Sequence, residues 1–299
     1  MLQEFDERNR DLIVNINGEL NHRDRARVSP FDSAVQGGDA VWEGLRLYDG
    51  KIFRLTGHLD RLRSSALAIG FASIPSHEEI VEQIRRTLNA NKMRDGVHIR
   101  LTLTRGVKTT SGMDPRLNRS GPTLIVLAEH KPPVYGTTGL TLITSSVRRM
   151  PPDCLDPKIH HTNLLPSILA KIEANAAGAD EAIMLDLQGF VAETNATHIF
   201  LVKGERILTS PTRACPEGIT RAVILELCAA NRIDHAVADL TTTDMYRADE
   251  MFLTGTMGEL APVVKVDGRT IGSVAPGRMT TKLTELFRAE VARSGQPVI

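Results

Sequence analysis

The stretch Asp156-Pro-Lys-Ile-His-His-Thr-Asn163 decides how the rest of the chain is interpreted. Its lysine, Lys158, lies in a predicted turn, and a predicted helix and a predicted hairpin separate it from the carboxylate of Glu193. A lysine amine can form a Schiff base, and a carboxylate can keep a ring nitrogen protonated. The stretch therefore suits a covalently held cofactor. Because most lysines of a soluble protein are solvated surface residues, other motifs have to support this interpretation.

Composition is that of an ordinary globular protein. A chain of 299 residues is long enough for about two domains, and 41% hydrophobic with 24% charged residues is typical of soluble proteins. The 36 basic residues balance the 36 acidic residues, which argues against a nucleic-acid-binding or anionic-membrane surface. No apolar run approaches the roughly 20 residues of a membrane span. The acidic N-terminus does not resemble a signal peptide.

The three cysteines, Cys154, Cys215 and Cys228, are scattered and lack metal-ligand spacing. They predict reduced thiols in a cytoplasmic protein. The pair His160-His161 has no acidic or thiol partner in sequence, so no metal site is expected. Walker and Gly-x-Gly-x-x-Gly motifs are absent from the sequence, which disfavours the nucleotide-binding folds that use them.

Hydrophobic periodicity predicts an α/β chain. Helices are expected near 58–68, 77–91, 163–177, from 220 onward and 277–293, and strands at 97–104, 121–127, 140–145 and 251–254. Asn17-Gly18, Asp49-Gly50 and Asp267-Gly268 predict tight hairpin turns. A Pro-Pro pair followed by a glycine predicts an interdomain linker at 132–137, between an N-terminal α/β domain, 1–131, and a C-terminal α/β domain, 138–299.

Two turns in the second half could bind a phosphate. The first contains Gly218, Ile219 and Thr220 and opens a predicted helix, whose free N–H groups and dipole favour an anion. The second contains Gly255 and Thr256 and follows a predicted strand. Taken alone, an ordinary helix N-cap and an ordinary strand-to-helix loop are the more common explanations of these residues. Neither turn therefore decides the function alone.

Together these motifs resemble the class IV, fold-type IV, pyridoxal-phosphate-dependent aminotransferases. This family contains branched-chain and D-amino-acid aminotransferases, (R)-amine transaminases and aminodeoxychorismate lyase. The resemblance extends from about Val28 to Ile271, and its segments keep the family's order along the chain. These segments are Trp42–Arg46, His58–Leu62, Lys158, Ala192–Phe200, Gly218–Arg221 and Gly255–Thr256.

The resemblance implies two α/β domains with pyridoxal 5′-phosphate in the cleft between them, in a homodimer whose partner completes the pocket. Lys158 resembles the lysine that forms the Schiff base and carries the proton, and Glu193 resembles the acid on the pyridine nitrogen. The cofactor residues that the resemblance implies are Arg61, Lys158, Glu193, Asn195, Gly218, Ile219, Thr220, Gly255 and Thr256. The implied reaction is ping-pong transfer of an amino group from an amino acid to a 2-oxo acid such as 2-oxoglutarate.

The substrate side of the resemblance leaves alternatives open. Trp42–Arg46 and the Gly255–Pro262 stretch are most similar to branched-chain enzymes, which favours aliphatic donors. Thr104-Arg105-Gly106 is similar to D-amino-acid aminotransferases, so either Arg105 or Arg100 could bind the substrate carboxylate. The expected substrate residues are Trp42, His98, Arg100, Arg105 and Met257. A D-amino-acid or (R)-amine transaminase, a lyase and a non-catalytic binding protein are the alternative functions.

Overall fold

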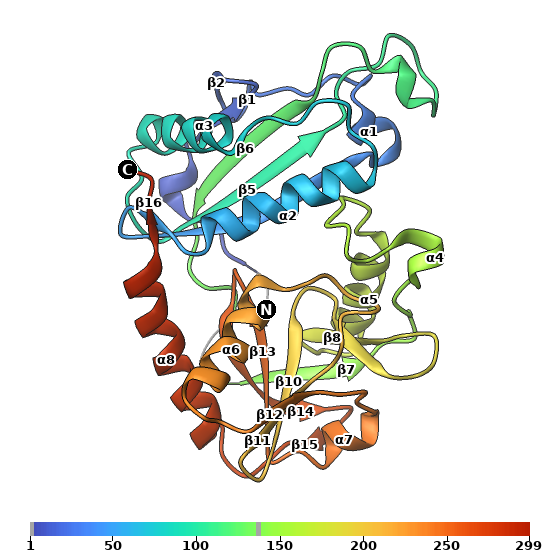
Figure 1. Ribbon diagram of the computed structural model, residues 1–299, viewed down its shortest axis with the longest axis vertical. Coiled ribbons are helices and arrows are strands. Elements are labelled where there is room, and N and C mark those ends of the chain that lie inside the picture. The colour runs from blue at the N-terminus through green and yellow to red at the C-terminus, as the bar shows by residue number, and fades with distance from the viewer. Residues whose placement is uncertain (1–2, 136–138) are drawn as a thin grey trace. The chain divides into compact units, whose positions relative to one another are not determined.

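The computed structural model describes residues 3–135 and 139–299 (Figure 1). The chain forms two compact units. One, the N-terminal unit, groups the described residues of Leu2–Pro132 with Ile159–Asn163 and Ser294–Ile299, and the other, the C-terminal unit, groups those of Pro133–Lys158 with Leu164–Arg293. The predicted linker 132–137 lies partly outside the described residues, and the predicted domain boundaries stay a prediction. Helices and strands alternate in both units, so the predicted α/β class is confirmed.

An antiparallel sheet forms the N-terminal unit, with seven strands among the described residues, in the order β16-β4-β3-β5-β6-β1-β2. Helices α2 and α3 cover one face of this sheet (Figure 1). The elements of the unit are η1 (Glu7–Asn9), β1 (Ile13–Ile16), β2 (Glu19–His22), α1 (Ser33–Gly37), β3 (Ala40–Tyr48), β4 (Lys51–Ile52), α2 (Leu55–Ala68), α3 (His77–Ala90), β5 (Val97–Thr104), η2 (Pro115–Leu117), β6 (Thr123–His130) and β16 (Gln296–Pro297).

Alternation along the strands decides which face meets the helices. In β5 the side chains of Val97, Ile99, Leu101 and Leu103 are buried and belong to the hydrophobic core under the helices. The residues between them are only half-buried and lie on the opposite face. This opposite face carries polar side chains, among them three of the predicted substrate residues.

A mixed sheet forms the C-terminal unit, with nine strands among the described residues. Eight of them follow the order β12-β11-β10-β13-β14-β7-β8-β9, and β15 pairs with β14. The elements of the unit are β7 (Leu140–Thr144), α4 (Pro152–Leu155), α5 (Leu165–Ala176), β8 (Glu181–Leu185), β9 (Val191–Thr194), β10 (His198–Lys203), β11 (Arg206–Thr209), α6 (Ile219–Ala230), β12 (His235–Val237), α7 (Thr242–Tyr246), β13 (Glu250–Gly255), β14 (Glu259–Val266), β15 (Arg269–Thr270) and α8 (Arg278–Ser294).

The three predicted hairpin turns are confirmed by their backbone angles. Both residues of each pair have positive φ: 50° and 86° at Asn17-Gly18, 44° and 73° at Asp49-Gly50, and 49° and 79° at Asp267-Gly268. Positive φ at both central residues defines the type I′ turn, which suits the twist of a hairpin. The predicted helices and strands are also present, with ends displaced by a few residues. The short helices α1, α4 and α7 were not predicted, because five residues or fewer carry no usable period.

Residues 159–163 add a short extended piece to the N-terminal unit. Ala40 to Trp42 of β3 bind it through their backbone: Trp42 N–H donates to the His160 carbonyl at 2.9 Å, and Thr162 N–H donates to the Ala40 carbonyl at 3.0 Å. Val41 also bridges His161. Because β5 occupies the other side of β3, the added piece lies along the opposite edge. The residue after Lys158 therefore starts a segment whose position is fixed by β3.

The C-terminal residues complete the same unit. β16 pairs with β4, and Val298 N–H donates to the Gly50 carbonyl at 3.0 Å. The Val298 side chain is 3% exposed and belongs to the core of the N-terminal unit.

Candidate functional site

Glu193 lies on β9 of the C-terminal unit and is 4% exposed. Burying a carboxylate is costly unless a cation and hydrogen bonds compensate it. Arg149 supplies the cation, with its Nη2 2.8 Å from Glu193 Oε1. The same guanidinium donates to the Thr194 carbonyl at 2.7 Å and to Ser167 Oγ at 3.2 Å. Arg149 thus fixes the orientation of the predicted pyridine-binding acid.

The N-terminus of α6 holds the first predicted phosphate turn. Gly218 is its N-cap residue and supplies no side chain to bind the first-turn N–H groups, while Thr220 is 5% exposed. The first N–H groups of a helix have no acceptor within the helix, so they and the helix dipole suit an anion. A Cβ at Gly218 would lie 2.3 Å from ring atoms of His198. Glycine is therefore required by a close approach of this turn to β10.

His198 and its neighbour connect the predicted segments within this unit. His198 Nε2 lies 3.9 Å from Glu193 Oε2, and His198 pairs with Thr254 in the β10–β13 ladder. A Cβ at Gly255 would lie 3.1 Å from Thr197 Cγ2. Glu193, Gly218 and Gly255, far apart in sequence, thus each lie against residues 197–198. Thr256 and Met257 follow in the turn between β13 and β14.

Four buried hydrogen-bond donors of the C-terminal unit have no partner among the described residues. They are Arg149 Nε, Ser210 Oγ, Arg221 Nε and Thr254 Oγ1. Arg149 pairs with Glu193, Arg221 belongs to the first turn of α6, and Thr254 pairs with His198. Most buried polar groups in proteins are hydrogen-bonded. The orphaned donors, the glycine-lined turn and the buried acid fit a ligand with an anionic group and a basic ring nitrogen.

Two other residues that were predicted to bind the cofactor, Asn195 and Lys158, make contacts of a different kind. Asn195 joins β9 to β8, because its N–H donates to the Ala182 carbonyl at 2.9 Å and its Oδ1 accepts from Ala182 N–H at 2.8 Å. Lys158 is exposed, and its backbone N–H donates to Asp156 Oδ1 at 2.9 Å. Among the described residues, the Lys158 amine makes no hydrogen bond or ion pair. Its predicted Schiff-base role therefore stays a prediction.

Three predicted substrate residues of the N-terminal unit lie together on the sheet face away from α2 and α3. Arg100 Cζ is 4.0 Å from the centre of the Trp42 ring, and His98 pairs with Arg46 one register step along β3 and β5. His98 Nε2 is buried and has no hydrogen-bond partner among the described residues. Burial, with the charges of Lys131, Arg100 and Arg46, lowers the pKa of His98 to about 3.

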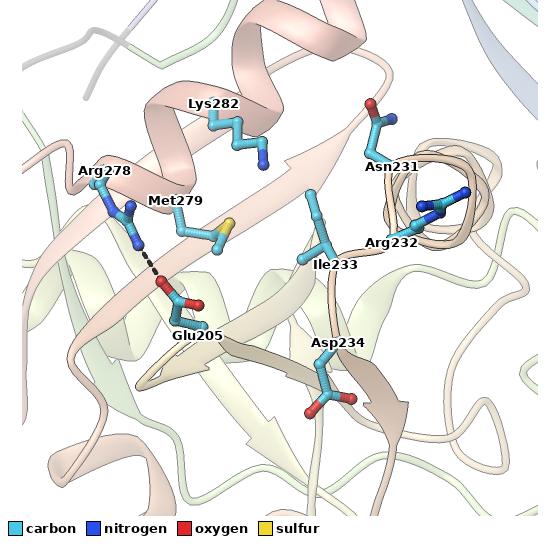
Figure 2. Close-up of a pocket in the computed structure, with 8 residues that line it drawn as sticks. All are labelled: Glu205, Asn231, Arg232, Ile233, Asp234, Arg278, Met279 and Lys282. Carbon is cyan, nitrogen blue, oxygen red and sulfur yellow. Dashed lines mark hydrogen bonds and ion pairs between the residues drawn. The ribbon is translucent and has the colours of Figure 1, made fainter.

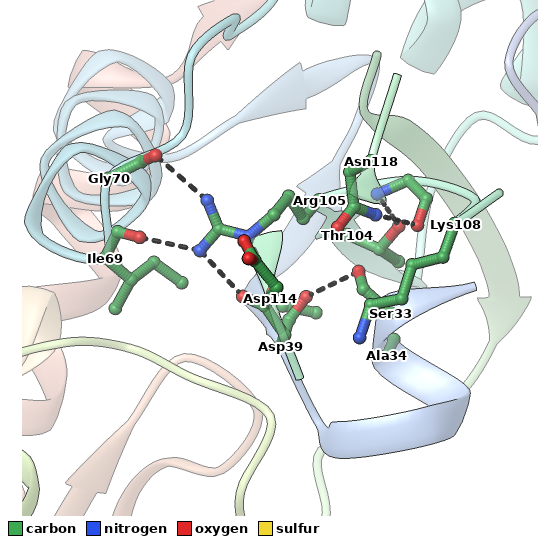
Figure 3. A network of polar contacts seen from close by, with 12 residues as sticks. Ser33, Ala34, Asp39, Ile69, Gly70, Thr104, Arg105, Lys108, Asp114 and Asn118 are labelled. Atoms are coloured by element: carbon green, nitrogen blue, oxygen red, sulfur yellow. Dashed lines mark hydrogen bonds and ion pairs between the residues drawn. The ribbon is translucent and has the colours of Figure 1, made fainter. Parts of the chain in front are cut away.

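Arg105, the other candidate for binding the substrate carboxylate, is held by polar contacts with neighbouring residues of the protein (Figure 3). Its Nε and Nη2 bind both carboxylate oxygens of Asp39, at 2.6 and 3.0 Å. Its remaining donors reach the carbonyls of Ile69 and Gly70, and the guanidinium lies over the Phe71 ring. All three nitrogens of this arginine therefore already have partners.

Arg61 is bound to a second buried carboxylate, Glu43, which is fully buried on the helix side of β3. Arg61 Nε and Nη2 bind its two oxygens at 2.7 and 2.8 Å. His58 Nδ1 and His160 Nδ1 lie 2.6 and 3.2 Å from the same carboxylate. Burial alone would raise the pKa of Glu43, but His160 and Arg61 outweigh it and hold that pKa well below its usual range.

Arg149 and Glu43 were missed at the sequence level. Arg149 lies 44 residues before its partner Glu193, and no motif distinguishes it from a surface arginine. Glu43 belongs to the Trp42–Arg46 motif, but its three partners come from α2 and from the segment after Lys158. Only the strand alternation could have indicated a buried acid, because it puts Glu43 on the same face of β3 as the core residues Val41, Leu45 and Leu47.

Two pockets lie away from Glu193 and from the N-terminus of α6. One, of about 260 Å³ in the C-terminal unit, is lined partly by charged residues including Glu205, Asp234 and Lys282, and by none of the predicted site residues (Figure 2). The other, of about 520 Å³ in the N-terminal unit, borders Arg105. Among the described residues, no helix has the length and apolar character that a membrane crossing requires.

Comparisons with known proteins give a consistent picture. The family model described as Amino-transferase class IV matches residues 40–266. "Branched-chain-amino-acid aminotransferase-like protein 2" of Arabidopsis thaliana is 53% identical over 291 residues, which cover 97% of this chain and 52% of that protein. The chain thus spans about half the length of this relative and of the like-named protein 1.

Two further matches cover nearly the full length of both partners. A "Putative branched-chain-amino-acid aminotransferase" of Methanocaldococcus jannaschii is 42% identical over 278 residues, or 93% of this chain and 96% of that protein. A solved branched-chain amino acid aminotransferase, complexed with N-(5′-phosphopyridoxyl)-L-glutamate, superposes with a TM-score of 0.89 at 31% identity. That match covers 97% of this chain and 99% of the solved chain.

Proposed function

Since this chain belongs to the class IV aminotransferase family, we propose that it is a pyridoxal-phosphate-dependent aminotransferase. It transfers an amino group between a branched-chain or other aliphatic amino acid and a 2-oxo acid such as 2-oxoglutarate, by a ping-pong mechanism. The observation that supports this most directly is the buried Glu193, oriented by Arg149 and lying with the α6 N-terminus around His198. The solved relative with bound phosphopyridoxyl-glutamate supports the same cofactor chemistry.

The residues of the C-terminal unit divide the binding of pyridoxal phosphate between them. The first N–H groups of α6, with the hydroxyls of Thr220 and Thr256, would bind the phosphate. Glu193 would hold the proton on the ring nitrogen, and Arg149 holds the Glu193 carboxylate in place through their ion pair. When bound, the cofactor supplies an aldehyde that captures an amine and a ring that withdraws electrons. Lys158 remains the proposed covalent anchor.

For the substrate carboxylate, the contacts favour Arg100 over Arg105. Arg105 has partners on all three of its nitrogens, whereas Arg100 lies over the Trp42 ring on a half-buried sheet face. A guanidinium can bind a carboxylate through two parallel hydrogen bonds. Trp42, His98 and Met257 are the proposed neighbours of the substrate side chain.

Assembly and location complete the proposal. α5 carries four exposed apolar side chains, Leu165, Ile168, Leu169 and Ile172, spaced i, i+3, i+4 and i+7 so that they share one face. An exposed apolar stripe of this kind is typical of a protein–protein interface, which supports a homodimer. The cysteines are unpaired, which supports a cytoplasmic protein.

The decisive test changes Glu193. Glu193→Gln keeps the size of the side chain but removes the negative charge, so the ring nitrogen is no longer held protonated. We expect the variant to bind pyridoxal phosphate and to lose about 100-fold or more of its transamination rate with aliphatic amino acids. Absorbance titration and a coupled 2-oxo-acid assay measure the two quantities.

The matched control is Glu205→Gln, because Glu205 lies in the same unit, is 80% exposed and pairs with Arg278. It should leave both quantities unchanged. A Glu193→Gln variant with wild-type rates would remove Glu193 from the proposed role. A wild-type protein that transfers no amino group from any amino acid, with cofactor present, would overturn the proposed function.

A further inference from the structure

The pocket of about 520 Å³ in the N-terminal unit has a one-sided charge. Residues 70–73, which follow α2, contribute to its lining, and so do residues at both ends of the β5–β6 connection. Among the described residues that line it, three are arginines and none is acidic. None of the predicted cofactor residues takes part. The pocket is therefore separate from the proposed phosphate and pyridine contacts.

The three arginines differ in the donors that they still offer. All three side-chain nitrogens of Arg105 already have partners within the protein (Figure 3). Arg116 binds Asp114 through Nε and Nη2, while its Nη1 has no partner among the described residues. Arg119 is exposed and makes no hydrogen bond or ion pair in the described part of the chain. The free donors at the pocket therefore come from Arg116 and Arg119.

The same residues set the charge that a ligand would meet. Asp39 balances Arg105 and Asp114 balances Arg116, because each acid pairs with its arginine. Arg119 is the one lining residue whose charge has no counter-ion within the described residues. A guanidinium with free N–H groups binds a carboxylate strongly, because the hydrogen bonds are assisted by charge. A ligand with one negative charge therefore matches the pocket.

Apolar side chains form much of the remaining lining. They are Phe71, Ala72, Pro115 and Pro122. Phe71 is 7% exposed, and its ring lies 4.6 Å from Arg105 Cζ, so the arginine holds one face of the ring in place. An apolar chain placed against these residues would lose contact with water, which favours binding. The lining therefore suits a ligand that joins an apolar chain to its charged group.

The β5–β6 connection is braced, so the pocket exists before a ligand binds. A Cβ at Gly106, where φ is 104°, would lie 1.8 Å from the Gly121 carbonyl oxygen, and the two ends of the connection thus approach closely. Asn118 Nδ2 donates to the Gly106 carbonyl at 2.6 Å, and the backbone of Asn118 bridges that of Lys108. A preformed pocket spares a ligand the cost of ordering the loop.

The charge pattern also selects among small anions. The ammonium group of an amino acid would find no acidic side chain among the described lining residues. The second negative charge of a phosphate group would meet no further unpaired arginine. A neutral alcohol would gain nothing from Arg119. A simple carboxylate avoids all three mismatches.

We infer that this pocket binds a small monocarboxylate with an apolar chain. Its carboxylate contacts Arg119 and the free Nη1 of Arg116, and its chain lies against Phe71. Saturated aliphatic carboxylates and aliphatic 2-oxo acids share this chemistry. The inference goes beyond the proposed aminotransferase function and does not depend on it, because it assigns a second ligand site that uses none of the cofactor residues.

The first experiment measures binding at the pocket itself, in the ¹⁵N-labelled protein supplied with pyridoxal phosphate. The amide signals of residues 71–73 and Gly121 are followed by NMR during titration with 4-methylpentanoate, 4-methyl-2-oxopentanoate, leucine or 4-methylpentan-1-ol. Both carboxylates should give saturable shifts, with a dissociation constant of about 1 mM or below. Leucine and the alcohol should bind about tenfold or more weakly. Tighter binding of the oxo acid would identify 2-oxo acids as the ligand, and equal binding would identify aliphatic carboxylates in general.

The second experiment repeats the titration with 4-methylpentanoate in three variants. Arg119→Glu reverses the unpaired charge and should weaken binding about tenfold or more. Ala72→Trp fills the pocket without changing an arginine and should abolish the shifts. Arg63→Glu is the matched control, because Arg63 is exposed on α2 in the same unit and does not line the pocket. Its affinity should equal that of wild type.

Four results would overturn the inference. They are the absence of saturable shifts with either carboxylate up to about 20 mM, equal affinity for the alcohol, equal weakening in Arg63→Glu and Arg119→Glu, and shifts that persist in both Arg119→Glu and Ala72→Trp. The last result would show that the signals respond to binding elsewhere. A wild-type protein without transaminase activity would overturn the proposed function alone, since the NMR titration does not require turnover.

Discussion

Glu43 and Glu193 are two buried carboxylates, each held by an arginine, one in each unit. A buried carboxylate retains its charge only when a cation and hydrogen bonds replace the water that it loses. The arginine therefore determines where the negative charge is available. At Glu193 that charge suits a protonated ring nitrogen, whereas at Glu43 the carboxylate contacts Arg61, His58 and His160.

At the scale of one residue, the stability of the protein in acid tests whether the His98 side chain is buried. Its pKa in the folded chain is about 3, below its ordinary value of 6.5. Above pH 6.5 the imidazole of His98 is neutral in both the folded and the unfolded chain. As pH falls below 6.5, the unfolded chain takes up a proton that the folded chain does not, so the free energy of unfolding decreases until pH reaches about 3. At pH 5 the loss is about 2 kcal/mol at most.

The measurement is urea unfolding of wild type and His98→Gln between about pH 7.5 and pH 5. Wild type should lose more stability than the variant over this range, by about 1 to 2 kcal/mol, because glutamine does not titrate. Parallel losses in the two proteins would show that His98 is accessible to protons in the folded state.

At the scale of elements, the beginning of α6 depends on one glycine. Gly218→Ala places a Cβ 2.3 Å from the His198 ring, so the turn or the buried histidine has to move. We expect pyridoxal phosphate to bind about tenfold or more weakly, because the N–H groups of the first turn are displaced. Titration of the cofactor absorbance measures the affinity.

Gly37→Ala is the control for that substitution. A Cβ there meets nothing within 4 Å, so cofactor affinity should be unchanged. If Gly218→Ala also bound the cofactor like wild type, the α6 N-terminus would not be the anion site.

Elements whose signal is local could be predicted, and contacts between distant residues could not. The Asn17-Gly18 pair carries its own backbone preference, so its turn was predictable from two residues. The capping box of Ser76 and Glu79 similarly marks where α3 begins. Arg149 and Glu193 meet only because β9 folds beside the segment after β7. Sequence order alone could also not show that Lys158 is exposed while His160 is covered by Trp42.

At the scale of the whole molecule, the exposed stripe of α5 predicts self-association. Ile168→Glu or Leu169→Glu places a charge in the apolar face, which should convert a dimer into a monomer. Light scattering after size-exclusion chromatography measures the mass. Leu187→Glu is the control, because Leu187 is also exposed but lies in the β8–β9 turn. Wild type that runs as a monomer at micromolar concentration would contradict the prediction.

The division of the chain into units has a consequence for protein synthesis. A ribosome that has released residues 3–132 has produced most of the N-terminal unit, but not the segment 159–163 on β3 or Val298 in its core. Both come later, and Val298 comes only after nearly all of the C-terminal unit. The N-terminal unit therefore remains incomplete while the C-terminal unit is translated. Chaperones that cover nascent chains would find their longest-lived target at the exposed edge of β3.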